Sequence, residues 1–122
     1  MISRLQSHQH PALPGVSVCA MNNKSLRLGQ SQEVLVTVVP DGIIPLHTHA
    51  CDADMYIVSG DAIVLSTDQN DDGQAVSPGY CVRFAAGVGH GFRAGPGGLS
   101  FVSRNGGIVD ETGEWDIQLA AA

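Results

Sequence analysis

PLHTHACDADMYIVSG, residues 45–60, places two histidines one residue apart at the end of an apolar run. Small and acidic residues follow, and a second apolar run then ends at a glycine. In an extended strand alternate side chains point to the same face, so His47 and His49 can reach one metal ion. The same alternation places Ile43 and Pro45 on their face. We therefore expect the histidine pair at the end of an apolar interior.

Short apolar and β-branched runs separated by turn residues make up most of the chain. EVLVTVV (33–39) ends at the turn signal PDG, DQNDDG (68–73) is a turn-rich loop, and GPGG (95–98) is expected to be a flexible turn. Further strands are predicted at 15–21, 25–30, 43–50, 55–60, 61–67, 80–87 and 99–104. No helical period of useful length and no repeat is present. The pattern predicts an all-β sandwich or barrel, and the tail from residue 110 is compatible with helical turns or a final strand.

The length of 122 residues suits one domain with its own core. Aromatic residues make up only 5%, so the core must consist largely of Val, Ile, Leu and Ala. We predict a loose, polar N-terminal arm over residues 1–15 and a single domain over 16–122. The arm contains a second His-x-His pair at residues 8–10. We expect that pair to bind nothing specifically, because nothing in the arm holds its geometry.

The charge and the cysteines limit the partners. The net charge is −6 and the six basic residues are scattered, which argues against nucleic-acid binding. No apolar run is long and uninterrupted enough to span a bilayer, and the N-terminus lacks the apolar region of a secretory signal. Three widely separated cysteines fit a reducing compartment. We predict a cytoplasmic protein that binds neither nucleic acid nor membrane.

A third histidine follows a strand and a tight glycine turn in GYCVRFAAGVGH, residues 79–90. Together the two histidine stretches resemble the two signature motifs of the cupin superfamily, G-x5-H-x-H-x3–4-E-x6-G and G-x5-P-x-G-x2-H-x3-N. The second motif keeps its spacing, with Ala85 and Ala94 where the family has Pro and Asn. In the first, one residue fewer separates Gly42 from the first histidine. The resemblance covers about residues 25–105.

This resemblance implies a double-stranded β-helix, a jelly-roll barrel of two antiparallel sheets. It also implies that His47, His49 and His90 are metal ligands lining the mouth of the barrel. Imidazole suits Fe, Mn, Ni, Cu or Zn, so the implied cofactor is a divalent transition metal of unspecified identity. Cupins commonly associate through sheet edges, and we predict a homodimer.

The glutamate that the family supplies after the first two histidines is missing. Counting forward from His49 leads to Asp54, whereas counting back from Gly60 leads to Ala53 and turns Asp54 outward unless a bulge shifts the chain. We place Asp54 first as the third ligand. Asp52, Cys51 and a site made of three histidines alone stay open, and both aspartates also fit turn residues at the entrance of a hairpin.

Several other residues are expected around this site. Tyr56, Tyr80, Arg83 and Arg93 are candidates to contact a substrate or the ligands, although a solvent-facing Arg83 is the favoured interpretation of that residue. Met55 and Phe84 are expected in the pocket wall or core, and Cys19 and Cys81 as buried strand thiols. Trp115 is expected to pack over the barrel or a partner subunit.

Such a site predicts a metalloenzyme acting on a small polar organic molecule, with dioxygenase chemistry as the first assignment. One alternative is a metal-dependent isomerase or lyase that uses the ion as a Lewis acid. Another is a non-catalytic module that binds or senses a small ligand, as the changed motif positions suggest. A structural dimer with a relict site is the remaining possibility.

Overall fold

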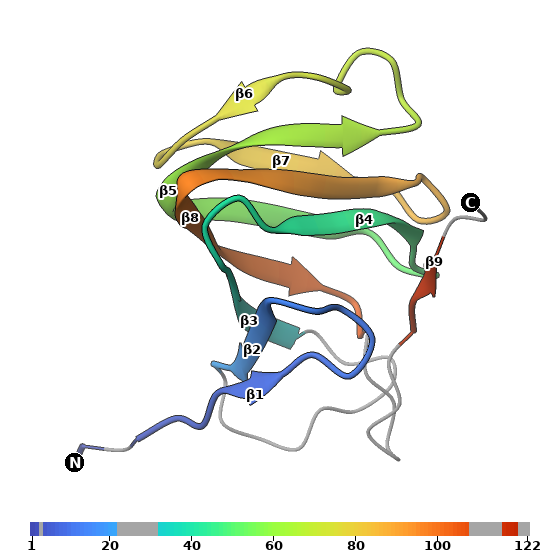
Figure 1. Cartoon of the computed structure of the whole chain (residues 1–122). Helices are drawn as coiled ribbons and strands as arrows, with labels where there is room; N and C mark the ends of the chain where they lie inside the picture. Colours follow the sequence, from blue (N-terminus) through green and yellow to red (C-terminus); the bar gives the residue numbers. More distant parts are fainter. Residues whose placement is uncertain (3, 22–31, 108–115, 120–122) are drawn as a thin grey trace.

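A computed structural model describes residues 1–2, 4–21, 32–107 and 116–119. The described residues form strands joined by turns and contain no helix, and every strand pair is antiparallel (Figure 1). The all-β prediction is therefore confirmed. The predicted strand at 25–30 and the expected packing of Trp115 lie outside the described residues.

The strands are β1 (His8–Gln9), β2 (Val16–Ala20), β3 (Gln32–Val38), β4 (Ile43–Thr48), β5 (Ala53–Ser66), β6 (Ala75–Val76), β7 (Cys81–Phe84), β8 (His90–Asn105) and β9 (Gln118–Leu119). One path of neighbours runs β1-β2-β3-β8-β4-β9, and β5 joins it by pairing with β8 while also pairing with β6 and β7. Figure 1 shows the resulting curled sheet, with β6 near one end and β1 near the other.

Two long strands, β5 and β8, run the length of this sheet. The first part of β8 lies between β4 and β5, and its second part lies between β3 and β5. In place of β5 the sequence predicted two strands, 55–60 and 61–67, and in place of β8 it predicted only a strand at 99–104 after a flexible turn. Instead the chain bends without ending, and the expected flexible turn at 95–98 is an internal part of β8.

The bend in β5 depends on Gly60. Its φ is +75°, and a Cβ atom there would lie 2.0 Å from the carbonyl oxygen of Gly98 in β8. Register shifts flank this position, between Ile57 and Ser59 and between Gly60 and Ala62. Glycine alone tolerates both the left-handed backbone and the close approach. Gly60, which the sequence pattern placed at the end of a strand, therefore bends a strand that continues.

The core follows the alternation of the strands. Val34, Val36 and Val38 of β3 are buried, and the residues between them are half-buried or exposed. Most of the core cluster is Val, Ile, Leu and Ala, as predicted, and three phenylalanines and Met55 complete it. No helix among the described residues has the length and apolar character that crossing a bilayer requires.

The segment before residue 16 is more ordered than expected. β1 pairs with β2, and the peptide N–H of His10 donates a hydrogen bond of 2.8 Å to the carbonyl of Val16. Leu13 is only 4% exposed and belongs to the core cluster. The expectation of a structureless arm therefore does not hold for residues 8–13, because an apolar side chain there anchors the segment to the barrel.

The cysteines differ in burial, and Cys19, Cys51 and Cys81 are all free thiols. Cys19 is buried in β2, as predicted. Cys81 is exposed, so the prediction that its thiol is buried is wrong. In β7 the residues that face inward are Val82, which is half-buried, and Phe84, which is buried.

Candidate metal centre

Three histidines from separate parts of the chain meet in the interior. His47 lies in β4, His49 follows that strand, and His90 begins β8. Each is at most 8% exposed, and one ring nitrogen from each lies within 4.8 Å of the others. His47 and His90 are also direct partners in the β4–β8 ladder. The convergence of these side chains, expected from the two motifs, is present.

A bulge in β4 sets the direction of His47. The pairing of β4 with β8 shifts in register between Ile44 and His47, so both of these side chains are buried. Ile43 is 48% exposed and Pro45 is also exposed. The expectation that Ile43 and Pro45 share the face of His47 is therefore wrong, because the bulge breaks the strict alternation of the strand.

Glycine in β8 makes room for this bulge. A Cβ atom at Gly91 would lie 2.1 Å from the carbonyl oxygen of Ile44. Any larger residue would push β4 away from the start of β8. Because His90 is the neighbour of Gly91, the same close approach holds His47 and His90 together.

The second ring nitrogen of each histidine is held by a backbone carbonyl. Nδ1 of His47 lies 2.8 Å from the carbonyl oxygen of Pro45, and Nδ1 of His90 lies 3.1 Å from that of Val88. Nδ1 of His49 contacts the carbonyl oxygen of Asp116. A carbonyl only accepts hydrogen bonds, so each Nδ1 carries the proton and each Nε2 keeps its lone pair. Metal-ligating histidines commonly use this arrangement.

Burial keeps these rings neutral. Burial lowers the pKa of His47 to about 3, and the nearby His90 and His49 lower it further. The hydrogen bond to the carbonyl of Pro45 acts in the opposite direction and raises this pKa. Burial likewise lowers the pKa of His90 to about 4, with the carbonyl of Val88 opposing it. The pKa of His49 is also lowered by burial, partly offset by Asp116. Neutral imidazole is the form that binds metal ions.

One ring nitrogen has no hydrogen-bond partner. Nε2 of His90 is fully buried and makes no hydrogen bond with any residue that the structure describes. The ring of Phe84 stacks on His90, with centroids 4.3 Å apart and planes 11° from parallel. A buried nitrogen without a partner costs free energy unless a bound group satisfies it. Its lone pair therefore fits a metal ligand.

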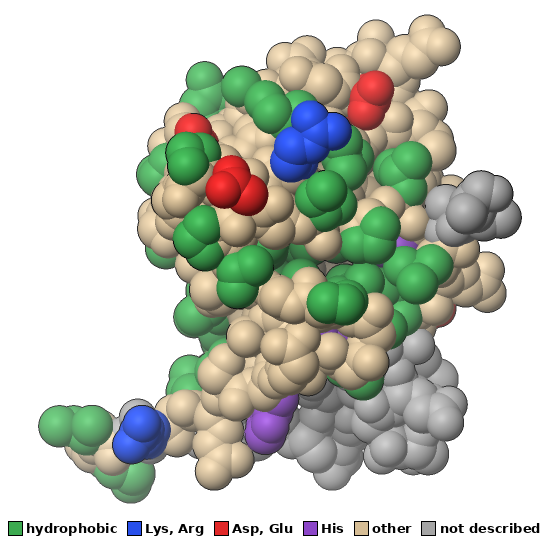
Figure 2. Space-filling view, in the orientation of Figure 1, with side chains coloured by type: hydrophobic (Ala, Val, Ile, Leu, Met, Phe, Trp, Pro, Cys, Tyr) green, Lys and Arg blue, Asp and Glu red, His purple; other side chains and the backbone are tan. Residues whose placement is uncertain are grey.

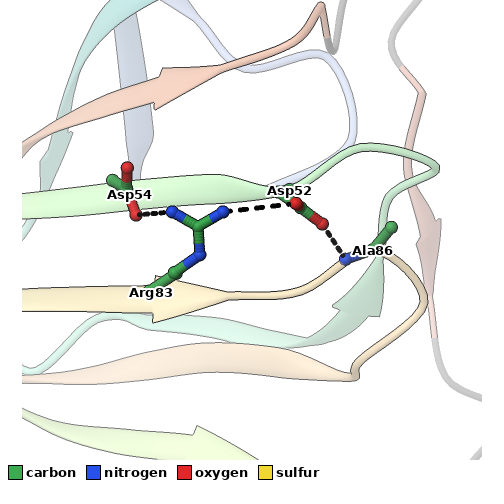
Figure 3. Close-up of polar contacts among 4 residues, drawn as sticks. All are labelled: Asp52, Asp54, Arg83 and Ala86. Atoms are coloured by element: carbon green, nitrogen blue, oxygen red, sulfur yellow. Dashed lines mark hydrogen bonds and ion pairs between the residues drawn. The ribbon is translucent and has the colours of Figure 1, made fainter.

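Asp54 does not join the histidines. In β5, Ala53 and Met55 are buried and Asp54 points to the other face, where its Oδ1 lies 3.4 Å from Nη1 of Arg83 (Figure 3). The prediction of Asp54 as third ligand needs correction, because no bulge shifts β5 between Ala53 and Ile57. The register counted back from Gly60 is the one that the chain adopts.

The two alternative ligands also lie elsewhere. Asp52 accepts a 2.8 Å hydrogen bond from the N–H of Ala86 and lies 3.3 Å from Nη2 of Arg83 (Figure 3). Cys51 is half-buried, which raises the pKa of its thiol, and it is outside the histidine group. Among the described residues, the site consists of three histidines without a carboxylate or thiolate.

The proposed substrate-contacting residues lie on the outside of the sheet. Tyr56 is 41% exposed and Tyr80 is 56% exposed. Arg93 is exposed too. The side chain of Arg83 is 66% exposed, which confirms the prediction that it faces solvent. None of the four lines the cavity at the histidines. Outward strand positions explain the placement of Tyr56, Arg83 and Arg93, whereas Tyr80 lies just before β7.

A small cavity of about 50 Å³ lies beside the three histidines. Its described walls are apolar apart from four histidines and Ser103, and they include Met55, as predicted. Phe84 lies in the core, also as predicted. By a comparable measure one water needs about 10–15 Å³, so the cavity has room for an ion and a few small groups.

Sequence reasoning missed two parts of this wall. His10 and Leu13 come from the N-terminal segment, and Ile117 comes from the tail. β9 pairs with β4 beside His47, so the described tail is a strand, one of the two alternatives left open. The available signals were the large apolar side chains of Leu13 and Ile117, which indicate burial without saying where.

Comparisons with known proteins give the fold a wider context. No protein-family model matches the chain, and no curated protein does. Among solved structures, the polyketide cyclase RemF from Streptomyces resistomycificus is similar, with a TM-score of 0.71, 18% identity, and coverage of 100% of this chain and 87% of that one.

Two further structures are similar. A protein with a double-stranded β-helix domain from Klebsiella pneumoniae has a TM-score of 0.68 and 20% identity, over 93% of this chain and 90% of that one. A variant of oxalate decarboxylase from B. subtilis has a TM-score of 0.67 and 17% identity, over 95% of this chain and 30% of that one. The double-stranded β-helix expected from the two histidine motifs is thus confirmed as the fold of this chain.

Proposed function

We propose that this protein binds one divalent transition metal through Nε2 of His47, His49 and His90 and uses it to act on a small organic molecule. The observation that carries the proposal is the set of three carbonyl contacts at Nδ1. They leave three neutral lone pairs in one buried group, and the buried Nε2 of His90 supports the same assignment.

The chemistry of these ligands narrows the metal. Imidazole is a borderline ligand that suits Fe(II), Mn(II), Ni(II), Cu(II) or Zn(II), whereas Mg²⁺ and Ca²⁺ prefer oxygen. When bound, the ion would polarise a substrate oxygen as a Lewis acid or, if redox-active, serve oxygen chemistry. The protein's own part is to hold the rings through backbone carbonyls and to keep the surroundings largely apolar.

Dioxygenase chemistry remains our first proposal for the reaction. An apolar wall suits O₂, which is itself apolar, and the small cavity admits only a compact substrate group beside the ion. A metal-dependent lyase or isomerase is the second proposal. It is supported by fold neighbours named as a polyketide cyclase and an oxalate decarboxylase. Binding of a small ligand without turnover is the alternative that the experiment must separate from both.

The metal site is tested on protein purified without a tag and stripped with chelator. Titration with Fe(II), Mn(II), Ni(II), Zn(II) and Co(II) should give one equivalent of bound ion for at least one of them. The double variant His47→Ala/His90→Ala should lose this binding, and His8→Ala, which changes an exposed histidine, should keep it. Equal metal binding by the double variant and the wild type would remove the site.

The reaction is tested on the metal-loaded protein. Oxygen uptake with Fe(II) and a panel of thiols, diols and 2-oxo acids tests the dioxygenase. NMR of the same compounds with the Zn(II) protein under nitrogen tests isomerisation and elimination. Tight binding of a compound with no turnover in either assay would favour the ligand-binding alternative.

We also infer a homodimer. Exposed apolar side chains support it, namely Val39, Ile43, Tyr56, Val58, Tyr80 and Leu119. Figure 2 shows several hydrophobic side chains exposed on the face in view. Clustered exposed apolar surface is typical of interaction sites. Sedimentation should give the mass of two chains, and a monomer across micromolar concentrations would contradict the dimer.

A further inference from the structure

Residues 116–119, the tail segment, lie against the metal centre although they are far from all three histidines in the sequence. The carbonyl oxygen of Asp116 accepts a hydrogen bond from Nδ1 of His49. The carboxylate of Asp116 accepts a second hydrogen bond, of 2.7 Å, from the peptide N–H of Ala50. One residue therefore holds both the ring of a candidate ligand and the backbone directly after that ligand.

The rest of the tail segment lies on the same part of the barrel. β9 pairs with β4, with Leu119 opposite His47 and Gln118 opposite Thr48 (Figure 1). Ile117 is partly buried against the core cluster and lines the cavity at the histidines. The strand pairing and both hydrogen bonds of the tail segment thus all end on residues 47–50.

The tail segment buries little apolar surface. β9 is two residues long and both are exposed, and Ile117 is only partly buried. Elements with few buried contacts open locally at a low free energy, while the rest of the fold stays intact. Undocking of the tail segment therefore leaves the strands that carry His47 and His90 in place.

Of the three candidate ligands, His49 alone depends on the tail segment for its tautomer. Nδ1 of His47 and Nδ1 of His90 contact carbonyls two residues earlier in the chain. Without the Asp116 carbonyl, Nδ1 of His49 loses the acceptor that fixes its proton, and the proton can move to Nε2. A protonated Nε2 has no lone pair for a metal ion.

We propose that Asp116 is a positioning residue of the metal centre, and that metal binding and docking of the tail segment stabilise each other. This inference rests on the proposed function. The docked segment keeps the lone pair of His49 on Nε2, so the ion binds this state more tightly. By linkage the ion then strengthens docking by the same factor. Because Ile117 lines the cavity, metal loading also completes the wall beside the ion.

Calorimetry of two Asp116 variants tests the positioning role, with the ion that the wild type binds most tightly among Fe(II), Mn(II), Ni(II), Zn(II) and Co(II). Asp116→Ala removes the acceptor for the Ala50 N–H, whereas Asp116→Asn keeps an acceptor oxygen and removes the charge. Asp68→Ala is the matched control, because the exposed Asp68 carboxylate also accepts a hydrogen bond from a backbone N–H, that of Asn70 at 3.0 Å.

We expect Asp116→Ala to bind the ion about tenfold more weakly than wild type, the scale for losing a group that orients a ligand, and Asp116→Asn to stay within about threefold. Asp68→Ala should match wild type. Wild-type affinity in Asp116→Ala, or equal weakening in Asp116→Asn, would overturn the positioning role and leave the metal site standing. Failure of the wild type to bind any of the five ions would overturn the proposed function as well.

The tautomer of His49 gives a readout without metal. Long-range ¹H–¹⁵N NMR spectra of the metal-free wild type should show the Nδ1–H form for His47, His49 and His90. In Asp116→Ala the signal of His49 should move toward a mixture of tautomers, while those of His47 and His90 stay unchanged. Equal changes in all three rings would indicate a general loss of structure and would overturn the specific role of Asp116.

Hydrogen exchange of the wild type tests the linkage without any variant. Saturation with the same ion should slow exchange of the amides in residues 116–119 by about tenfold, the factor expected for the affinity. β6 is the control, because it is also two residues long and pairs with β5 alone among the described strands. Exchange in β6 should slow much less. No slowing in the tail segment, or equal slowing in β6, would overturn the coupling.

Discussion

The metal-free protein should lose stability steeply between pH 6.5 and pH 5, and the buried histidines should be the cause. The pKa of His47 is lowered from 6.5 to about 3 and that of His90 to about 4, mainly by burial. In the unfolded chain both rings take up a proton as the pH falls below 6.5, while in the folded chain both stay neutral. The unfolded state therefore binds more protons in this window, and stability rises with pH. The contribution is complete above pH 6.5 and is lost as the pH falls toward 3 to 4.

The magnitude follows from the same values. For every pH unit below 6.5, each histidine lowers the free energy of unfolding by about 1.4 kcal/mol. At pH 5 the free energy of unfolding is therefore lower by about 2 kcal/mol for each histidine and by about 4 kcal/mol for the pair. Domains of this size are stable by about 5–15 kcal/mol in total. The loss is therefore a large share of the stability, and His49, whose pKa is lowered too, acts in the same direction.

Urea unfolding of chelator-treated protein at several pH values between 5 and 7.5 measures this loss. The double variant His47→Gln/His90→Gln removes both titrating groups. The slope of its free energy of unfolding against pH should therefore be smaller, by an amount that corresponds to about two protons taken up on unfolding. His8→Gln, at an exposed histidine, should keep the wild-type dependence. An equally steep dependence in the double variant would refute the reasoning, since the protons would then bind elsewhere.

Three further outcomes are expected. Gly60→Ala should destabilise the protein by more than about 2 kcal/mol in urea unfolding, because the added Cβ atom meets the Gly98 carbonyl and the backbone has a positive φ. Gly73→Ala is the control: its φ is also positive, but the Cβ atom enters open space, so it should cost only about 1 kcal/mol. Asp52→Ala should weaken metal binding several-fold in calorimetry, because it releases the N–H of Ala86. The free energy of unfolding should change by less than about 1 kcal/mol, because the ion pair of Asp52 with Arg83 is exposed. Unchanged metal affinity would show that this turn does not position His90. Saturating Zn(II) at about 100 times its Kd should add about 2.7 kcal/mol at pH 7.5 and nearly as much at pH 5, where His47 and His90 are still neutral in the folded chain. Loss of most of this gain by pH 5, measured by thermal unfolding, would contradict the lowered pKa values of these ligands.

The sequence was most informative where one local rule decides the outcome. Alternating apolar residues gave the strand class and the inward faces of β3. The paired motifs gave His47, His49 and His90 as a group, although they lie far apart in the chain. Counting back from Gly60 also turned Asp54 outward. Preferring the forward count was the error, because it required a shift of one residue before Ile57 that β5 does not have.

The bulge exists, but in β4. Pro45 is a local signal for the register shift between Ile44 and His47, because proline cannot donate to the ladder. The shift also depends on the close approach of β4 to Gly91 in β8, which the letters IIPLH do not show. The bend at Gly60 has the same character, because it depends on Gly98 across the sheet. Alternation within one strand cannot predict a feature whose cause lies in the neighbouring strand.

The backbone carbonyls that bind Nδ1 of the three histidines also differ in how far away they lie in the sequence. His47 and His90 each bond through Nδ1 to the carbonyl of the residue two positions earlier, Pro45 and Val88. Those two tautomers are set within a few residues of chain and exist as soon as each turn forms. They belong to the part of the site that a motif can encode.

His49 differs, because its Nδ1 is held by the carbonyl of Asp116, 67 positions away, and the Asp116 side chain accepts a 2.7 Å hydrogen bond from the N–H of Ala50. The same stretch continues into β9, which pairs with β4 at His47. The third lone pair is therefore oriented only when the tail docks beside β4. Docking of β9 and completion of the metal site are, on this geometry, one event, and no spacing between histidines could have revealed it.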